Sequence, residues 1–258
     1  MRYFNNLYKA RYILMNLVSQ DLRNKYRNSV IGVGWSLLTP LGLVVIIGVV
    51  FSTVLGQPIR DFIPYLFSGL MPWLYIVQCA DGGTGAFISA EGYIKQTQTP
   101  VEIFPVRVAA GAFINFLYSL IAFSAVYIFL KPEKYGINML PIFISLLLLL
   151  LFGIALSTIS AVINTYFRDF GPLQSLFLQG LFYATPIMFP AELLNKPYVK
   201  WIYEWNPLYY IMDMIRKPLL GDPVYFTSWI VAPIFILTLF FIAIAIMTRI
   251  GRAITFKI

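Results

Sequence analysis

Long runs without a charged side chain dominate the pattern of hydrophobic and polar positions along the chain. Six of these runs are long enough to cross a membrane, and they cover residues 28–59, 62–80, 108–130, 135–167, 170–191 and 223–248. An α-helix needs about 20 apolar residues to cross the hydrocarbon core of a bilayer. The pattern predicts an all-α polytopic membrane protein with six spans, at about 33–55, 63–90, 106–130, 139–164, 171–190 and 226–249.

The second of these spans is the most interrupted. Pro64 and Pro72 lie inside it, and Asp81 precedes the run Gly82-Gly83-Thr84-Gly85. We expect the helix to continue through this run to about Ala90, because glycine is tolerated in membrane helices and lets neighbouring helices approach closely. No lysine follows the glycines, which favours a packing face over a phosphate-binding loop.

The distribution of Lys and Arg predicts how the spans are oriented. Twelve of these residues fall on the side that carries both termini and seven on the other side, and four of the seven lie in the single segment 191–222. Positive charge is enriched in cytoplasmic loops, so we expect both termini in the cytoplasm. The first apolar run begins about 30 residues into the chain and is longer than the apolar region of a signal peptide, so cleavage is not expected.

Composition supports a membrane protein and excludes several kinds of chemistry. Of the 258 residues, 59% are hydrophobic and 12% are charged, and a soluble fold of this size would expose large apolar patches. The chain has no histidine and one cysteine, Cys79, which excludes His-containing catalytic triads, His-ligated metals and intrachain disulfides. No Gly-Lys dipeptide occurs, which excludes a Walker A loop, so any ATP must be bound by another chain. The net charge of +8 favours anionic headgroups over nucleic acid as a partner, although the bias toward positive cytoplasmic loops alone also explains it.

Residues 1–30 are predicted to form an amphipathic helix on the cytoplasmic membrane surface. Its apolar face comprises Phe4, Leu7, Tyr8, Leu14, Met15, Val18, Leu22 and Tyr26, and its polar face comprises Lys9, Asn16, Gln20, Arg23 and Arg27. Arg11 interrupts the apolar face and can extend toward the headgroups. Such a helix serves either as a plain anchor or as a clamp that contacts a partner protein or a lipid headgroup.

Two connections between spans are unusual in composition. Residues 91–105 are polar and then mixed, with Pro100 able to end one short helix and Pro105 able to begin the next, so the segment is either a linker or a short docking helix. Residues 191–222 are too polar to span the membrane, and they are rich in aromatics that favour the membrane interface, namely Trp201, Tyr203, Trp205, Tyr209 and Tyr210. The alternatives here are an interfacial hairpin and a re-entrant pair of half-helices, interrupted at Asn206-Pro207, before the last span.

Three groups of residues, taken in order, resemble a known family. They are Asp21-Leu22-Arg23-Asn24-Lys25-Tyr26-Arg27-Asn28-Ser29 with Ile31-Gly32-x-Gly34-Trp35-Ser36-Leu37-Leu38-x-Pro40; Tyr166-Phe167-Arg168-Asp169 with Phe182-Tyr183-Ala184-Thr185-Pro186-Ile187-Met188-Phe189-Pro190; and Asn206-Pro207-Leu208 with Ile211 and Arg216. Their order and spacing resemble the permease subunits of ABC exporters for bacterial cell-surface polysaccharides, above all O-antigen exporters, with teichoic-acid exporters as relatives. The resemblance covers nearly the whole chain.

The resemblance implies a half-transporter in a bacterial inner membrane. In such a transporter two copies pair to form a channel for lipid-linked polysaccharide, and two separate subunits that bind ATP and magnesium attach from the cytoplasm. No cofactor, metal or catalytic residue is then expected on this chain. The resemblance places an interface helix at 4–28, a type-2 exporter transmembrane domain over 31–258, and a re-entrant segment at 191–222 that shapes the periplasmic exit. The coupling helix, which inserts into a cleft on the ATPase, matches about 93–103, and its expected contacts are Lys95, Gln96, Thr97, Thr99 and Glu102.

Candidate substrate contacts follow from the chemistry of a lipid-linked polymer. Arg23, Lys25 and Arg27, with Arg168, can attract the diphosphate of a carrier lipid near the cytoplasmic surface. Alternatively, Arg168 pairs with Asp169 and caps the adjoining helix ends. A long hydrated polymer favours a continuous channel in which sugar rings lie against aromatic rings, and the candidates for its lining are Trp73, Tyr75, Tyr183 and Phe189.

Other functions remain open from the residues alone. Export of teichoic acid or of a small hydrophobic, drug-like molecule uses the same architecture, although a small molecule needs a closed apolar pocket rather than a channel. A membrane glycosyltransferase needs clustered carboxylates, whereas the 11 acidic residues are scattered. A stand-alone channel or secondary transporter more often carries charge in mid-span, and the one candidate, Asp81, lies near a span end.

Overall fold

The computed structural model describes residues 2–27, 29–97, 99–134, 136–190 and 197–257. These residues form helices and connections without a β-strand, which confirms the predicted all-α class. In chain order the helices are α1 (Arg2–Lys9), α2 (Arg11–Tyr26), α3 (Trp35–Leu55), α4 (Ile59–Thr84), α5 (Glu91–Gln96), α6 (Ile103–Leu130), α7 (Ile142–Tyr166), α8 (Phe170–Ala184), α9 (Pro197–Glu204), α10 (Pro207–Leu219) and α11 (Phe226–Lys257). Short 3-10 turns lie at Gly32–Gly34, Pro132–Lys134 and Ile137–Met139.

The described part of the chain contains five helical stretches that are long and apolar enough to cross a membrane. They are Gly32–Val54, Ile59–Thr84, Ile103–Leu130, Ile137–Tyr166 and Phe226–Gly251. Helix α8 covers most of the predicted fifth span, but its 15 residues extend only about 22 Å, less than the hydrocarbon core. It ends where Thr185 precedes Pro186, because a residue before proline is disfavoured in the helical conformation. The protein is therefore a multi-pass membrane protein, and the sixth crossing stays a prediction.

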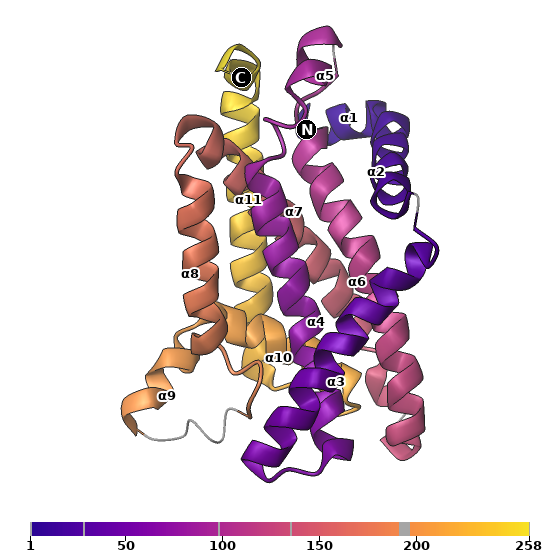
Figure 1. Ribbon diagram of the computed structural model, residues 1–258. Helices are drawn as coiled ribbons and strands as arrows, with labels where there is room; N and C mark the ends of the chain where they lie inside the picture. The colour runs from indigo at the N-terminus through magenta and orange to yellow at the C-terminus, as the bar shows by residue number, and fades with distance from the viewer. Residues whose placement is uncertain (1, 28, 98, 135, 191–196, 258) are drawn as a thin grey trace.

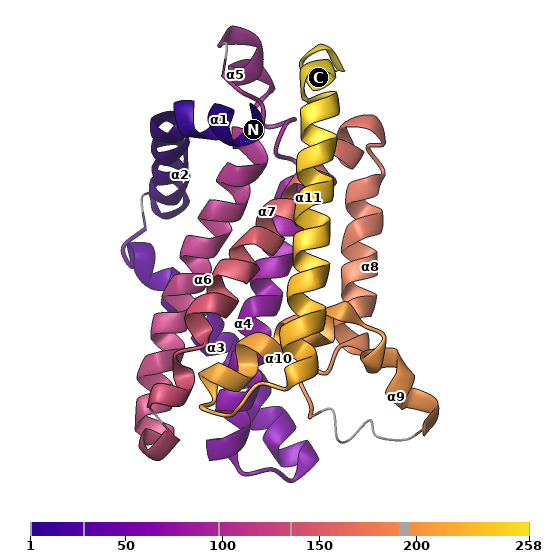
Figure 2. The same ribbon diagram turned by 180° about the vertical axis from the view of Figure 1, so that it is seen from behind.

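The connections gather at two ends of the bundle (Figures 1 and 2). Both termini, α1, α5 and the α7–α8 turn lie at one end, which we call the N/C end. The α3–α4 and α6–α7 connections, α9 and α10 lie at the other, which we call the far end. The sequence predicts that the N/C end faces the cytoplasm.

Helix α4 is the central and most buried helix of the bundle. In its most apolar stretch 72% of the residues are buried, against 22–33% in the other four stretches. A helix shielded from lipid by its neighbours needs fewer apolar residues, which explains why α4 also has the lowest mean hydropathy, 1.3 against 2.0–2.9. Gly85–Ala90 form turns rather than the expected continuation of this helix.

Glycine allows α4 and α7 to approach closely. A Cβ added to Gly83 of α4 would lie 2.7 Å from the Cα of Ser157 on α7 and 2.9 Å from its carbonyl oxygen. A Cβ added to Gly153 of α7 would lie 1.9 Å from the hydroxyl of Tyr75 on α4. These contacts confirm Gly83 as part of a packing face, the prediction made for the glycine-rich run.

The N-terminal segment differs from the single helix expected there. It divides at Ala10, whose backbone angles (φ −94°, ψ 10°) lie outside the helical region. Tyr3, Ala10, Leu17 and Val18 are buried against the bundle, whereas Phe4, Tyr8 and Met15 are exposed. Leu7 and Leu14 of the predicted apolar face are half-buried against an apolar cluster at the N/C end. The predicted face is therefore divided, with one part packed against the bundle and another part pointing away from it.

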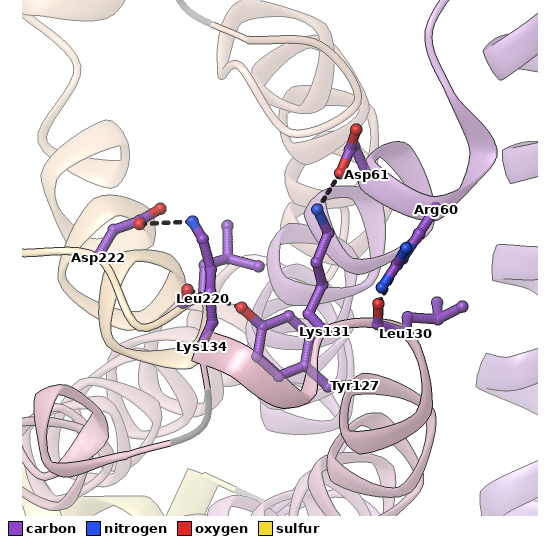
Figure 3. A network of polar contacts seen from close by, with 8 residues as sticks. All are labelled: Arg60, Asp61, Tyr127, Leu130, Lys131, Lys134, Leu220 and Asp222. Carbon is purple, nitrogen blue, oxygen red and sulfur yellow. Dashed lines mark hydrogen bonds and ion pairs between the residues drawn. The ribbon is translucent and has the colours of Figure 1, made fainter.

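A network of polar contacts holds the connections together at the far end (Figure 3). Its contacts join Arg60 Nε to the Leu130 carbonyl oxygen (2.7 Å), Asp61 to Lys131, the Tyr127 hydroxyl to the Leu220 carbonyl oxygen (2.7 Å), and Lys134 to Asp222 (2.9 Å). These contacts link the beginning of α4, the end of α6 and the turn that follows α10. They fix the far end of the bundle from three separate parts of the sequence.

Candidate functional site

Helix α5 projects beyond the other helices at the N/C end (Figure 1). It is anchored by Ile94, which is buried in an apolar cluster that includes Phe87, Phe104 and Met247. Lys95 and Gln96 are exposed, and Lys95 pairs with Glu91 one turn earlier at 2.6 Å. This bond lowers the pKa of the Glu91 carboxyl. α5 is thus a short polar projection held on an apolar base.

The rest of the predicted coupling segment folds back onto the protein. The Thr97 hydroxyl lies 2.8 Å from the Tyr93 carbonyl oxygen and 2.9 Å from the Thr99 hydroxyl, in a turn that follows α5. Glu102 is only 8% exposed and accepts a hydrogen bond from Asn6 Nδ2 of α1 at 2.9 Å. Lys95 and Gln96 therefore face outward, while Glu102 binds another part of the same chain. Contact with an ATPase stays a prediction for all five residues.

Helices α1 and α2 are bonded to the beginning of α6, just after the α5 turn. Arg107 donates from both Nε and Nη2 to the carboxylate of Asp21 on α2. Tyr3 of α1 is buried nearby, and burial together with the charge of Glu102 raises the pKa of its hydroxyl. With the Asn6–Glu102 bond, these contacts make α1, α2, α5 and the beginning of α6 one connected unit.

Two adjoining cavities beside α2 have polar side chains in their largely apolar walls. The first, about 380 Å³, lies between α3, α4 and α6, and the second, about 430 Å³, shares with it Lys25, Gln78 and Asn115. Lys25 Nζ lies 3.3 Å from Asn115 Oδ1, which also accepts a hydrogen bond from the Ser36 hydroxyl at 3.3 Å. Burial lowers the pKa of Lys25. Asp81 also lines the second cavity, which therefore contains both a basic group, Lys25, and an acidic one.

The structure brings together three of the four predicted headgroup contacts. Arg23, Lys25 and Arg27 lie at the end of α2, where all three are exposed and Lys25 also lines the two cavities. Arg168 is exposed in the α7–α8 turn, on the opposite side of the bundle from α2 (Figures 1 and 2). A single chain therefore presents two separate basic positions.

The predicted Arg168–Asp169 cap at the α7–α8 turn is wrong. Asp169 occupies the N-cap position of α8, but its side chain makes no capping hydrogen bond. Asn164 Oδ1 instead accepts from the Gly171 backbone N–H at 3.1 Å, and its Nδ2 donates to the Thr84 carbonyl oxygen at 2.8 Å. An amide carries both a donor and acceptors, so it satisfies the ends of two helices at once, which an ionised carboxylate cannot do.

The four predicted channel-lining residues lie in different environments. Trp73 and Tyr75 of α4 are buried within the chain, and Trp73 contacts the ring of Phe182 with centroids 5.7 Å apart. Phe189 is half-buried, and its carbonyl oxygen accepts a hydrogen bond from Tyr65 at 3.0 Å. Tyr183 of α8 is 68% exposed, so it alone of the four presents most of its ring outward. Their role in a channel stays a prediction.

Arg216 of α10 joins three parts of the structure near the far end. Its Nη1 donates to the Tyr65 hydroxyl of α4 at 2.6 Å and to the Pro186 carbonyl oxygen at 2.8 Å, and its Nη2 donates to the Ile187 carbonyl oxygen at 2.8 Å. The guanidinium also lies 4.1 Å from the centre of the Tyr65 ring. Gly69 leaves room for it, because a Cβ there would lie 1.9 Å from Nη2.

Sequence reasoning gave no separate role to Arg216, Gln78 or Asn115. Their position within apolar segments was a usable signal, because a polar side chain in a membrane span needs a partner. Such residues tend to mark contacts inside the protein or paths for substrate. The partners themselves lie far away along the chain and could not be inferred. Among the described residues, no group of three or more His, Cys, Asp and Glu side chains could hold a metal ion.

Comparisons of the sequence with known proteins identify its family. The sequence profile of the ABC-2 type transporter family matches residues 13–220. The chain is 29% identical to the O-antigen export system permease protein RfbA of Myxococcus xanthus over 196 residues, which cover 76% of this chain and 75% of that protein. It is 30% identical to a protein of the same name from Klebsiella pneumoniae over 199 residues, with the same shares covered. It is 23% identical to the polysialic acid transport protein KpsM of Escherichia coli over 210 residues, 78% of each chain. The chain therefore belongs to the ABC-2 type transporter family, as one of its membrane permease subunits.

Proposed function

We propose that this permease exports a lipid-linked cell-surface polysaccharide of the O-antigen type, as a pair of copies driven by two ATPase subunits. The names of the relatives support the substrate class, and membership of the family implies an ATPase partner. The observation that carries the mechanism is α5, a polar helix exposed at the N/C end and anchored by Ile94. In this function the N/C end faces the cytoplasm of a bacterial inner membrane.

The contacts around α5 provide a route for movement from the ATPase to the spans. α5 is followed by the turn that leads directly into α6, and α6 is bonded to α1 through Glu102–Asn6 and to α2 through Arg107–Asp21. Because α2 precedes α3, a displacement of α5 reaches both α3 and α6. ATP binding by the partner biases the permease only if the ATPase contacts α5 differently in its two states.

The transported polymer passes between two copies of the chain. The described cavities, from about 380 to about 720 Å³, have the size of small-molecule sites and are too small for a polysaccharide. Helix α8 carries the exposed Tyr183 beside Phe182, whose ring contacts Trp73. Exposed aromatic faces of this kind bind the C–H faces of sugar rings weakly and repeatedly, which lets a chain move without being held.

Arg23, Lys25 and Arg27 of α2 attract the diphosphate of the carrier lipid at the cytoplasmic surface in this proposal. All three lie at the end of α2, and attraction of anionic groups by such a cluster falls off within a Debye length of the surface. Their replacement by Ala should lower export while the ATPase still co-purifies. Unchanged export in the triple variant would exclude this role.

Co-purification with the ATPase tests the proposed docking. The tagged chain is captured from native membranes in mild detergent, and we expect an ATP-binding subunit to be recovered with it in equal amounts. Lys95→Glu should reduce ATPase recovery, because it reverses the charge of an exposed α5 side chain that pairs with Glu91. Lys200→Glu is the matched control, since Lys200 is also exposed and pairs with Glu204 one turn away at 2.8 Å, but it lies on α9 at the far end.

Surface glycan then tests the substrate. A strain that lacks the permease should recover surface polysaccharide with the wild-type chain and with Lys200→Glu, but not with Lys95→Glu. If the ATPase co-purifies but no glycan is exported, the proposal of an ABC transporter stands and the proposal of a polysaccharide substrate is refuted. Failure of the wild-type chain to capture an ATPase would refute the docking on α5.

A further inference from the structure

A large apolar cavity lies along one side of α8, and it shares no residue with the two cavities beside α2. It has a volume of about 720 Å³, and α4, α7, α8, α10 and α11 all contribute to its walls. We call it the α8 cavity. Its walls are almost entirely apolar, with Ile76, Ile159, Leu173, Phe177 and Leu239 as representatives of four of these helices.

One polar group inside the α8 cavity has a donor without a partner. Gln174 of α8 is only 8% exposed, and its Oε1 accepts a hydrogen bond from the Ser160 hydroxyl of α7 at 2.6 Å. Its Nε2 has no hydrogen-bond partner among the described residues. A buried donor of this kind is costly unless something satisfies it, and nearly all buried polar groups in proteins are satisfied. We therefore expect the cavity to hold an occupant with a hydrogen-bond acceptor that satisfies Gln174 Nε2.

The position of Gln174 indicates what that occupant is. The side chain lies four residues after the beginning of α8, about 6 Å along the helix from the N/C end. From there the apolar walls continue toward Leu181 and Leu208, in the direction of the far end. Asn206 also lines the cavity beside Leu208, but its amide donates to the Thr185 hydroxyl and accepts from the Leu208 backbone N–H. Among the described residues, the unsatisfied polar group of the cavity therefore lies near one membrane surface, and apolar walls continue deeper inside. A diacyl phospholipid has the same profile, with ester carbonyls at the boundary of the headgroups and acyl chains running toward the bilayer centre.

We propose that the α8 cavity binds an acyl chain of a diacyl phospholipid from the leaflet at the N/C end, and that Gln174 Nε2 donates a hydrogen bond to the ester carbonyl of that lipid. A water molecule would satisfy the amide but not the apolar walls, whereas the lipid satisfies both. The proposal requires only that the protein spans a membrane, and it is independent of the exported substrate.

Photolabelling of the full chain in vesicles tests this site. The vesicles contain phosphatidylethanolamine and phosphatidylglycerol, with a small fraction of phosphatidylethanolamine that carries a diazirine in one acyl chain. Labelled peptides are mapped by mass spectrometry after irradiation. We expect labels on the peptides that carry Ile159, Leu173 and Phe177, and we expect excess unlabelled phosphatidylethanolamine to reduce them.

Three variants separate a site from general contact with lipid. Leu173→Trp narrows the cavity and should abolish the labels there. Leu176→Trp is the matched control, because Leu176 of the same helix is similarly exposed (67% against 53% for Leu173) but lies outside the cavity walls, and it should leave the labels unchanged. Gln174→Met keeps the shape of the side chain but removes the donor, and should reduce labelling about fivefold, the equivalent of one neutral hydrogen bond of about 1 kcal/mol. If Gln174→Met fails to fold, the two tryptophan variants still decide the outcome.

Two results would overturn the proposal. Labels that are unchanged in both Leu173→Trp and Gln174→Met would show that the cavity is not the labelled place. Labels that a polyprenyl phosphate displaces and phosphatidylethanolamine does not would assign the cavity to a carrier lipid instead of a phospholipid.

Discussion

Replacement of Gly83 by Ala tests the close contact between α4 and α7. The added Cβ would lie 2.7 Å from Ser157 Cα and 2.9 Å from its carbonyl oxygen, closer than real Cβ contacts come. Both neighbours are backbone atoms, so no side chain can rotate away and the two helices must separate. Overpacking of this kind costs about 1–3 kcal/mol, against a gain of at most about 1 kcal/mol from the higher helix propensity of Ala. We expect a net loss of about 1–2 kcal/mol in the free energy of unfolding.

Gly180→Ala is the control for this substitution. Gly180 lies in α8, and a Cβ added there meets no heavy atom within 4 Å. The helix-propensity gain is then unopposed, and the change should lie between no effect and about 1 kcal/mol of stabilisation. The two glycines receive the same methyl group, so any difference between the variants reports the contact with Ser157.

The chain provides its own probe for the measurement. Its one cysteine, Cys79, is fully buried, so a fluorogenic maleimide reacts only when the bundle opens. Unfolding by SDS in mixed micelles, followed through this reaction, gives the free energy for each variant. Equal stability of Gly83→Ala and Gly180→Ala would refute the close approach of α4 and α7, and with it the explanation for the glycine-rich run.

Three further outcomes follow from single contacts. Glu102→Ala and Asn6→Ala, combined in a double-mutant cycle, should show a coupling energy of about 1.5 kcal/mol, because the Asn6–Glu102 hydrogen bond is partly buried and charged. Additive losses of stability would mean that this bond does not form. Asn164→Ala should cost about 1–2 kcal/mol in the same unfolding assay, and Asp169→Ala less than about 0.5 kcal/mol, since Asn164 makes the bonds at both helix ends. A larger loss for Asp169→Ala than for Asn164→Ala would show that Asp169 caps α8 after all. Burial raises the pKa of Asp213, so the folded chain retains this proton to a higher pH than the unfolded chain. The resulting stability is present below the ordinary carboxyl pKa and is lost as pH rises through the raised value, and Asp213→Asn should flatten that decline at pH values above the ordinary carboxyl pKa of about 4. A variant with the same pH dependence as the wild type would contradict it.

The charge-free runs were sufficient to predict the long helices, because a membrane span leaves a strong signal in local sequence. They did not reveal which spans face lipid and which face protein. The proline-containing second run corresponds to α4, a continuous helix whose apolar pattern can be interrupted because its neighbours shield it from lipid. The fifth run is apolar to its end, yet α8 ends at Thr185–Pro186 because proline overrides hydropathy there.

The candidate site was harder to predict, because its contacts connect distant parts of the chain. Lys95 is exposed on a short helix, as expected for a docking residue, whereas Glu102 was placed in the same group and binds Asn6, 96 positions away. Trp73 and Tyr75 were chosen as aromatic residues near a possible path, but burial depends on which helix is central, and that is a property of the assembled bundle. Local patterns indicate which residues carry chemistry, and the tertiary fold decides what each one meets.

The bonds of Arg216 determine how α8 is able to move. One guanidinium holds the two carbonyl groups that follow α8, at Pro186 and Ile187, together with Tyr65 of the central helix. Because a single side chain makes all three bonds, a shift of this end of α8 relative to α4 breaks them together. At the N/C end, α8 is held to α4 by Ser175, which donates to Asp81 at 2.9 Å, and by Asn164, which joins the Gly171 backbone N–H to the Thr84 carbonyl oxygen. Helix α8 is therefore fastened to α4 at both of its ends, and it can tilt relative to the central helix only if the bonds at one end break.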